Sequence, residues 1–511
     1  MLLLLRLLFV AALVSVTASA KTYYVDSAAG NDANDGLAEA RAWKTLDKVN
    51  GTTFVASDRI LFKAGSTYTG QLRPRGSGKE GSPIVVDMYS SGEKPLIAAE
   101  GKFKEALLIE NQDFWEVNNL QFTNTGAKRE KFRYGVRVRA WDYGTMRHIH
   151  LKNLYVHDVN GSLVKKDEGE GHGITWENGG GKVQSRFDGL LIEGCHLVRT
   201  DRNGICGYVG YRAAKARALP SLNVVIRKNL LEDIGGDAIK VWGCDRALVE
   251  HNVVRGARTR CDDYAAGIWP WASDNTLIQF NEVSGMKGMK DGQAFDSDAY
   301  TTNTTFQYNY THDNEGGFML VCCFENTGTV IRYNISQNDR ERLFHMAGSN
   351  ENIEIYNNVF HVGKGIDIHL FLWTPGQGGW TRNARIFNNI FYVEGTGQNS
   401  SGERRKPVDD GTYISRPGFG GATKIVFDRN VLYGNFPDVP KDWKTMVADP
   451  KLMSPGSGRS GLASLDGYKL QNSSPAIGAG ISAKNSGGRD FWGNPVPEGK
   501  NPSIGAHEPK R

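Results

Sequence analysis

A short pattern recurs along this 511-residue chain and limits the folds that it can adopt. Alternating apolar residues lead to an asparagine and a further apolar residue, as in LIQFNEV, VIRYNIS and IEIYNNVF. The asparagines are Asn119, Asn153, Asn229, Asn252, Asn281, Asn309, Asn334, Asn358, Asn389 and Asn430. From Asn229 to Asn358 the steps are 23, 29, 28, 25 and 24 residues. Short strands at this period are typical of a solenoid of β-coils.

In such a solenoid, each coil satisfies its backbone by parallel pairing with the next coil, about 4.8 Å away. An asparagine at the end of each strand can bond the backbone at a bend, and stacked asparagines can bond one another. The segment EGCHLV around Cys195 fills the gap between Asn153 and Asn229. We therefore interpret the asparagines as residues that hold the coils together and not as a functional site.

A second strand precedes each asparagine strand, as in GITWEN, AIKVWG, GIWPWA and AFDSDA. Successive side chains of a strand point to opposite faces, so parity sorts them. The inward residues are Val136, Ile174, Ile205, Ile239, Ile268, Phe295, Met319 and Phe344. One outward column is Arg137, Thr175, Cys206, Lys240, Trp269, Asp296, Leu320 and His345; the next is Arg139, Glu177, Tyr208, Trp242, Trp271, Asp298, Cys322 and Ala347.

The outward face concentrates aromatic rings beside charged groups. Exposed aromatics flanked by polar groups suit sugar rings, whose apolar faces stack on indoles while their hydroxyls bond carboxylates. The candidate substrate-binding residues are Trp242, Trp269, Trp271, Tyr208, Glu177, His172, Arg137, Arg139, Arg342 and His345. The alternative is that loops cover the tryptophans, which would then form a second small core.

Aspartates on this face suggest glycoside hydrolysis, in which two carboxylates flank the scissile bond. Asp296 and Asp298 are two residues apart, so their Cα atoms would lie about 6.6 Å apart on a strand. Asp237 would lie two coils from Asp296, or about 9.6 Å. Crowded carboxylates raise one pKa, which can keep one of them protonated as the acid. By contrast, Asp291 precedes a glycine and is interpreted as a turn residue.

A lyase is the alternative chemistry. Lys240 lies where a base could abstract the proton beside a uronate carboxylate, although it could equally be an ion-pair partner of Asp237. Arginine side chains or Ca²⁺ would neutralise that carboxylate. The aspartates that could hold Ca²⁺ are Asp237, Asp262, Asp263, Asp296 and Asp298. The catalytic candidates are therefore Asp296, Asp298, Asp237 and Lys240. Ca²⁺ is the possible cofactor, and the sequence does not assign its ligands.

The N-terminus, MLLLLRLLFVAALVSVTASA, has the features of a secretory signal with cleavage after Ala20. We therefore expect a chain exported to the periplasm or the medium. Six cysteines fit export without a disulfide-dense scaffold. A net charge of +5 without a long basic run argues against nucleic-acid binding, and no later apolar segment is long enough to span a membrane. We expect a monomer that acts on a polysaccharide or oligosaccharide.

The opening TYYVDSAAGNDANDGLAEARAWKTLDKVN resembles the N-terminal cap of secreted right-handed parallel β-helix proteins, the pectate-lyase-like superfold. The tail segments ADPKLM, YKLQNSSPAIGAG and DFWGNPVPEGKNPSIGAHE resemble their C-terminal region. The resemblance implies an all-β fold of about ten coils, with residues 1–20 as signal peptide, 21–440 as the β-helix with its cap, and 441–511 as a C-terminal cap segment.

This superfold hosts polysaccharide lyases, glycoside hydrolases, esterases and non-catalytic adhesins, so the fold does not settle the function. A polysaccharide-degrading hydrolase that uses the paired aspartates is the first hypothesis. A lyase with Lys240 as base is the second, and a glycan-binding surface protein without catalysis is the third.

Overall fold

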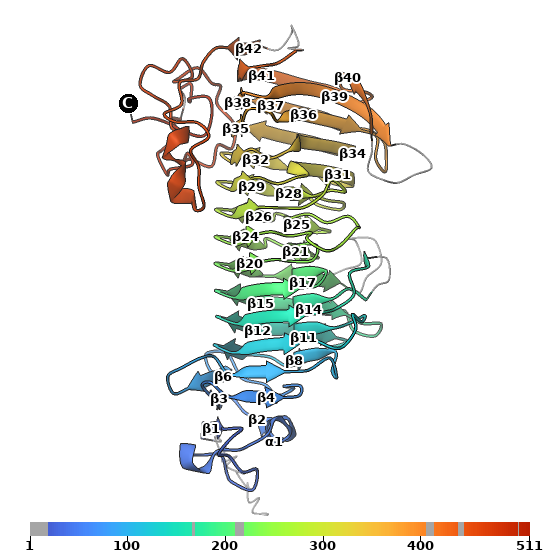
Figure 1. The fold of residues 1–511 in the computed structure, drawn as a ribbon, viewed down its shortest axis with the longest axis vertical. Coiled ribbons are helices and arrows are strands. Elements are labelled where there is room, and N and C mark those ends of the chain that lie inside the picture. Colours follow the sequence, from blue (N-terminus) through green and yellow to red (C-terminus); the bar gives the residue numbers. More distant parts are fainter. Residues whose placement is uncertain are drawn as a thin grey trace, which may run out of the picture.

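The chain forms a long parallel β-helix of stacked coils in a computed structural model (Figure 1). The structure describes residues 19–165, 169–209, 219–404, 413–437, 444–498 and 500–510. Apart from its last two residues, the predicted signal peptide lies outside these ranges, and so does the predicted boundary at residue 440. The predicted all-β solenoid is confirmed, because strand after strand pairs in parallel with its counterpart in the next coil.

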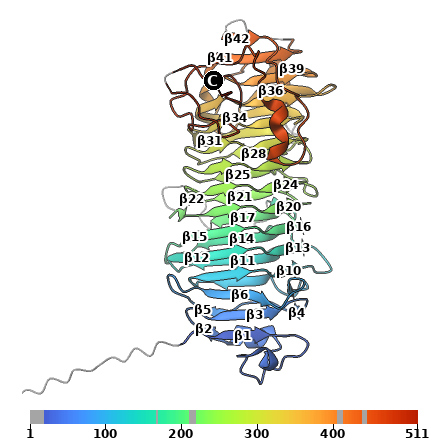
Figure 2. The same ribbon diagram turned by 90° about the vertical axis from the view of Figure 1, so that its left-hand side faces the viewer.

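The first of three sheets carries the outward columns, and Figure 2 shows its strands stacked one above another. It runs through β8 (Glu105–Glu110), β11 (Tyr134–Trp141), β14 (His172–Gly179), β17 (Asn203–Val209), β21 (Ile239–Trp242), β25 (Ile268–Trp271), β28 (Gln293–Ser297), β31 (Gly317–Thr327), β34 (Glu341–Tyr356), β36 (Asp367–Thr374) and β39 (Thr396–Arg404). An antiparallel strand, β40 (Tyr413–Pro417), pairs with the last of them.

The second sheet runs through β1 (Thr22–Val25), β3 (Arg59–Lys63), β6 (Ile84–Tyr89), β9 (Trp115–Asn118), β12 (Thr145–Lys152), β15 (Arg186–Glu193), β19 (Val225–Arg227), β23 (Leu248–Glu250), β26 (Leu277–Gln279), β29 (Thr305–Gln307), β32 (Val330–Arg332), the end of β34, β37 (Arg382–Phe387) and β41 (Thr423–Gly434).

The third sheet runs through β4 (Thr67–Thr69), β7 (Leu96–Ala98), β10 (Gln121–Asn124), β13 (Tyr155–Val159), β16 (His196–Thr200), β20 (Leu230–Glu232), β24 (Val253–Arg255), β27 (Glu282–Ser284), β30 (Tyr310–His312), β33 (Ile335–Gln337), β35 (Val359–Val362), β38 (Ile390–Val393) and the end of β41. The stack thus begins well before the first asparagine repeat.

The remaining elements are short: β2 (Thr53–Phe54), β5 (Arg75–Gly76), β18 (Ser221–Leu222), β22 (Cys244–Asp245), β42 (Lys444–Val447), the helix α1 (Leu46–Gly51) and the 3₁₀ helices η1 (Glu39–Arg41) and η4 (Leu462–Tyr468). None of the helices in the described ranges has the length and apolar character that a membrane span needs.

The predicted inward column is confirmed residue by residue. Val136 pairs with Ile174, and the register continues coil by coil through Ile268 and Phe295 to Phe344. All of these side chains are fully buried in one continuous core. Burial of apolar surface at about 25 cal/mol per Å² therefore fixes which parity faces inward, and a slip of one residue would expose the whole column.

Buried asparagines form an uninterrupted hydrogen-bonded ladder from Asn229 to Asn430. In each step, Nδ2 donates to Oδ1 of the asparagine in the next coil, at 2.9–3.0 Å. The same Oδ1 also accepts the backbone N–H of the asparagine before it, as Asn309 Oδ1 does from Asn281 at 2.9 Å. Each amide therefore satisfies polar groups of two coils at once, which is how buried polar groups remain stable.

The first two asparagines of the repeat, Asn119 and Asn153, do not belong to this ladder. The predicted alignment of the repeats is therefore wrong by one residue in these two coils. Asn119 and Asn153 have φ angles of 57° and 55°, so they occupy the left-handed position that precedes the ladder position. Leu120 and Leu154 fill the ladder column there and are fully buried. Asparagine tolerates the left-handed conformation better than most residues, so the same residue type serves both positions.

Terminal segments pack against the stack at its N-terminal end and along its side. At the N-terminal end, α1 buries Leu46 and Val49 beneath the first coils (Figure 1). The segment after β42 packs against the side of the later coils, where Leu465 and Tyr468 meet aromatic residues of the second and third sheets. Tyr356 Oη, for example, donates to the carbonyl of Asn485 at 2.6 Å.

We expect Asn309→Ala to lower the free energy of unfolding by about 3 kcal/mol or more. The substitution removes the buried hydrogen bonds of the Asn309 side chain with Asn281 N and Nδ2, the Ile278 carbonyl and Asn334 Oδ1, and a buried group that loses its partner costs about 1–3 kcal/mol. Urea denaturation followed by circular dichroism would measure the change. The control is Asn435→Ala, which removes one exposed side-chain bond. Equal midpoints for the two variants would contradict the structural role of the ladder.

Candidate active site

A cavity of about 1050 Å³ lies on the outer face of the first sheet. Strands from β11 to β31 contribute its floor, and residues of the connecting segments contribute its rim. Several sequence-predicted residues line it: Arg137, His172, Glu177, Tyr208, Lys240, Trp242, Trp269, Trp271 and Asp298. The other predicted residues, Asp237, Asp296, Arg139, Arg342 and His345, are not among the lining residues, and neither are Asp262 and Asp263. The alternation of side chains along the strands therefore correctly predicted most of the strand residues that line the cavity.

The cavity wall contains a column of aromatic rings, one from each of five successive coils. Tyr208 packs edge-to-face on Trp242 at 5.0 Å, and Trp242 packs on Trp271 at 4.3 Å between ring centroids. Tyr300 and Phe324 continue the column with spacings of 6.3 and 4.9 Å. All five rings are half-buried and line the cavity. The column runs along the stack and offers apolar surface for successive sugar rings.

Lys240 lies on the cavity floor and is almost fully buried. Its Nζ lies 3.7 Å from Glu170 Oε2 and over the rings of Trp242 and Trp269, at 5.0 and 5.5 Å from their centroids. Burial alone would lower the pKa of Lys240, but the Cys206 thiol, Glu170 and Asp237 outweigh it and raise the pKa above its usual value. A lysine held protonated in this way is a poor general base.

Asp237 lies behind the floor and holds the site together. Its Oδ1 accepts the indole Nε1–H of Trp269 at 3.0 Å and the backbone N–H of Ala266 at 2.9 Å. Its Oδ2 lies 3.2 Å from Arg202 Nη1, and both side chains are fully buried. The ion-pair partner of Asp237 is therefore Arg202, and the contacts of this carboxylate orient Trp269.

Charged residues at one end of the cavity form an alternating network. Arg137 bridges Glu105, at 2.7 Å, and Glu177 on the next coil, with its Nε 2.9 Å from Oε2. Arg139 contacts the same Glu177 oxygen at 3.3 Å and Glu110 at 2.8 Å. Nearby, burial lowers the pKa of His172 to about 3, so this imidazole is neutral at physiological pH. Glu177 is thereby fixed at the cavity wall as a hydrogen-bond acceptor.

Three aspartates on and beside β28 are electrostatically coupled, and one of them, Asp298, lines the cavity. Asp298 is half-buried, and its Oδ1 accepts the backbone N–H of Ala299 at 2.6 Å. Asp296 is only 3% exposed, and burial, together with Asp298 and Asp291, raises its pKa well above the usual value. Burial also raises the pKa of the half-buried Asp291 to about 6; Lys165 opposes this shift and Asp298 adds to it. Asp291 and Asp296 therefore keep their protons to a higher pH than an ordinary aspartate does.

Arg342 and His345 support this region from behind. Arg342 is almost fully buried, and its Nη2 donates to the carbonyls of Met289, at 2.8 Å, and Asp291, at 3.2 Å. Gln293 contacts the same carbonyl of Asp291, at 2.8 Å, and Arg342 Nε, at 2.9 Å. His345 Nε2 lies 2.9 Å from Thr374 Oγ1. Arg342 therefore positions Asp291 and does not contact the cavity.

Sequence reasoning missed Glu170, Lys165 and Asp291. Glu170 and Lys165 belong to a connecting segment, which has no periodicity that would place its side chains. Lys240 and Arg202 lower the pKa of Glu170 to about 2 against the effect of burial, so Glu170 is the anion that pairs with Lys240. Asp291 precedes Gly292 and is predicted to be a turn residue, and its φ angle of 60° agrees with a turn. Its carboxyl group nevertheless interacts electrostatically with Asp298 and Asp237.

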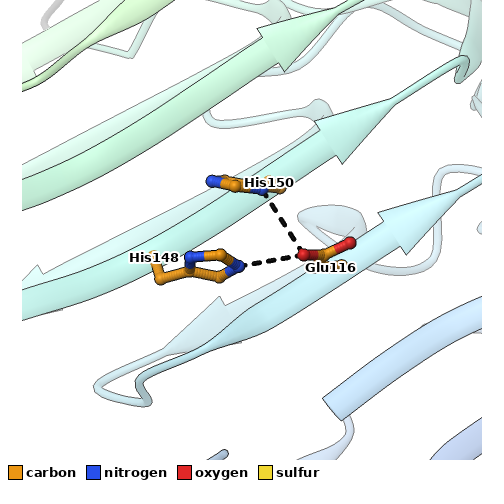
Figure 3. Close-up of side chains that lie close together, drawn as sticks. All are labelled: Glu116, His148 and His150. Carbon is orange, nitrogen blue, oxygen red and sulfur yellow. Dashed lines mark hydrogen bonds and ion pairs between the residues drawn. The ribbon is translucent and has the colours of Figure 1, made fainter. Parts of the chain in front are cut away.

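A cluster of potential metal ligands lies on β9 and β12 and is not part of the cavity lining (Figure 3). His148 Nε2 and His150 Nδ1 lie 2.9 and 3.5 Å from the same oxygen of Glu116, and Lys152 Nζ lies 2.7 Å from the other oxygen. Imidazoles suit transition metals, whereas Ca²⁺ takes oxygen ligands. This cluster therefore does not fit the predicted Ca²⁺.

Comparison with models of known protein families finds no match. Among curated proteins, the lacto-N-biosidase of Bifidobacterium longum is 29% identical over 603 aligned residues, which cover 97% of this chain and 37% of that protein. The chain thus spans little more than a third of the length of this curated relative.

Solved structures give a consistent result. The GH136 lacto-N-biosidase from Eubacterium ramulus is 29% identical with a TM-score of 0.63, and the match covers 73% of this chain and 68% of that one. A mannuronic acid-specific family 6 polysaccharide lyase from the human gut microbiota matches with a TM-score of 0.51 at 15% identity, over 84% and 92% of the two chains, which concerns the fold alone. The resemblance to carbohydrate-active β-helix proteins is confirmed, and the prediction of a glycoside hydrolase is supported.

Proposed function

We propose that this chain is an exported glycoside hydrolase that cleaves oligosaccharides containing a lacto-N-biose unit. The observation that carries the proposal is the coupling of Asp298, in the wall of an aromatic-lined cavity, to Asp291, whose pKa is raised to about 6. A hydrolase needs one carboxylic acid and one carboxylate, and two environments of this kind supply them. The likeness to lacto-N-biosidases supports the choice of substrate.

Asp291 is the proposed general acid. Asp291 is half-buried as a residue, although it is not among the residues that line the cavity, and its raised pKa keeps a large protonated fraction near pH 6. Asp296 has a raised pKa as well, but it is only 3% exposed, whereas Asp291 is half-buried; neither residue is among those that line the cavity. We therefore replace the pair predicted from sequence, Asp296 and Asp298, with Asp291 and Asp298.

Asp298 is the proposed partner that acts on the opposite side of the scissile bond. It lines the cavity beside Trp271 and Tyr300, and the backbone N–H of Ala299 stabilises its charged form. It would act either as a nucleophile or as the base that activates water. The negative charges of Asp298 and, after it, Asp237 add to the effect of burial and help to keep the proton on Asp291.

The aromatic column is proposed to bind the sugar rings, and Glu177 their hydroxyl groups. The cavity volume of about 1050 Å³ lies just above the range of roughly 300–1,000 Å³ that small-molecule sites occupy. It therefore has room for more than one sugar ring, as cleavage at a disaccharide unit requires. Lys240 and Glu170 neutralise each other beneath the column and keep the floor polar without net charge.

The lyase hypothesis has less support, because it needs Lys240 as an unprotonated base. The pKa of Lys240 is raised, and Glu170 holds the ammonium group in an ion pair. A lyase would also release products that absorb ultraviolet light, whereas a hydrolase releases reducing ends without a new double bond. The same substrate panel, scored both ways, separates the two reactions and also exposes a binding protein that has no turnover.

Asp298→Asn and Asp291→Asn should each lower kcat by at least about 10²–10³-fold on an aryl lacto-N-bioside, because each removes one of the two catalytic carboxyl groups. Asp367→Asn is the matched control, since Asp367 is exposed at the start of β36. Asp296→Asn should cost less kcat than Asp291→Asn. The reverse order would restore the pair predicted from sequence.

The rate should fall as the pH rises through about 6, because Asp291 must be protonated to act as the acid. This limb of the kcat/KM profile should be lost in Asp291→Asn, whose residual rate can no longer depend on that proton. A falling limb that persists in the variant would assign the acid to another group.

Export is proposed on the signal-like residues 1–20 alone. Expression of the full chain in a secreting host should yield a mature protein that begins at Lys21. N-terminal sequencing of the exported fraction measures this, and an intact Met1 in a cell-associated protein would contradict it.

A further inference from the structure

Two consecutive cysteines lie beside Asp298, and the second of them lines the cavity. The Sγ atoms of Cys322 and Cys323, in β31, lie 2.7 Å apart, and Cys322 Sγ donates to Asp298 Oδ1 at 3.3 Å. Cys323 is half-buried and lines the cavity. Neighbouring side chains of a regular strand point to opposite faces, so two consecutive thiols should not meet. Their contact therefore requires a local change in the backbone.

That change is visible at Cys323, whose φ angle is 78°. A residue other than glycine in this region costs about 1–3 kcal/mol and persists only where the surroundings enforce it. Gly348 pairs with Cys323 in the next coil, and a Cβ there would lie 2.1 Å from the carbonyl oxygen of Cys323. The glycine thus leaves room for the turned backbone that brings both sulfur atoms to one side.

We propose that Cys322 and Cys323 are a modification site that closes to a disulfide between consecutive residues when the chain meets a small-molecule disulfide such as oxidised glutathione. The Cys323 thiolate attacks one sulfur of the oxidant and releases one glutathione thiolate. The Cys322 thiolate then attacks Cys323 Sγ and releases the second. Two electrons pass from the cysteines to the oxidant, and the two thiol protons go to the solvent or to the released thiolates.

The other cysteines do not offer this chemistry. Each of their thiols lies against a backbone carbonyl: Cys195 against Leu151, Cys206 against Gly207, Cys244 against Trp242 and Cys261 against Asp263, at 3.2–3.7 Å. Within the described ranges, the contact between Cys322 and Cys323 is the one contact between two thiols. The pair is also the one that opens to the cavity, through Cys323.

The bond should form slowly and be easy to reduce. The contact with Cys322 would lower the pKa of Cys323, but burial and the nearby Asp298 and Asp296 outweigh it and raise the pKa to about 12, so little thiolate is present at neutral pH. Consecutive Cα atoms are about 3.8 Å apart, closer than the roughly 4.4–6.8 Å of ordinary disulfides, and such strained bonds are more easily reduced.

Closure of the disulfide would change the surroundings of Asp298, a consequence that rests on the proposed function. The reduced Cys322 thiol donates a hydrogen bond to Asp298, whereas a disulfide sulfur has no proton to donate. The ionised carboxylate would retain the backbone N–H of Ala299 but lose one donor. The acidic limb of the kcat/KM profile should therefore move to higher pH in the oxidised protein.

The test is intact-mass analysis of the full chain after treatment with oxidised glutathione, denaturation and alkylation without reductant. We expect four of the six thiols to be alkylated, a mass deficit of about 2 Da before alkylation, and an internally bridged peptide that contains both cysteines. Dithiothreitol should restore all six thiols. Cys323→Ser and Cys322→Ser should abolish the deficit, while the matched control Cys244→Ser should retain it; circular dichroism would confirm that each variant folds.

Several outcomes would overturn the proposal: six alkylated thiols after oxidation, a glutathione adduct on Cys323 that never closes, or a deficit that survives in Cys323→Ser. The mass readout does not depend on catalysis, so an inactive protein that still forms the bond would reject the proposed function and leave the modification site standing. A pH profile that is identical before and after oxidation would reject the link to Asp298.

Discussion

The amide side chain at the end of each asparagine strand is the interaction on which the rest of the structure depends. Because one amide donates and accepts at once, each ladder residue between Asn252 and Asn389 bonds the coil before it and the coil after it. The ladder therefore fixes both the spacing and the register of the coils. Every column on the outer face inherits that register, including the aromatic column that lines the cavity.

The cavity floor shows how charged groups are buried in this fold. Lys240 and Glu170 compensate each other, as do Arg202 and Asp237. A buried ion pair contributes little net stability, but it holds its members in place when further hydrogen bonds complete the shell. Here those bonds reach Trp269, so the electrostatic layer beneath the cavity orients a ring that faces it.

Parity along the strands was enough to predict which residues share the outer columns, because a buried inward face leaves no freedom of register; Trp242 and Trp271 are an example. Residues of connecting segments, such as Glu170, could not be placed, since no period governs them. Asp291 was misjudged for a different reason: an Asp-Gly turn is ordinary local chemistry, and the sequence does not show that its carboxyl group is buried within electrostatic reach of Asp298. Asn153 was misaligned because asparagine suits two adjacent positions.

The site takes one layer of residues from each of several coils, so successive layers of the site are spaced by the distance between coils, about 4.8 Å. Loss or duplication of a whole coil before β8 or after β37 would shorten or lengthen the molecule and leave the residues that line the cavity in place. Loss or duplication of a coil between β17 and β28 would move the aromatic rings relative to Asp298 by one coil spacing. Chains of this architecture could thus change the length of glycan that they accommodate by whole steps, without altering a single side chain.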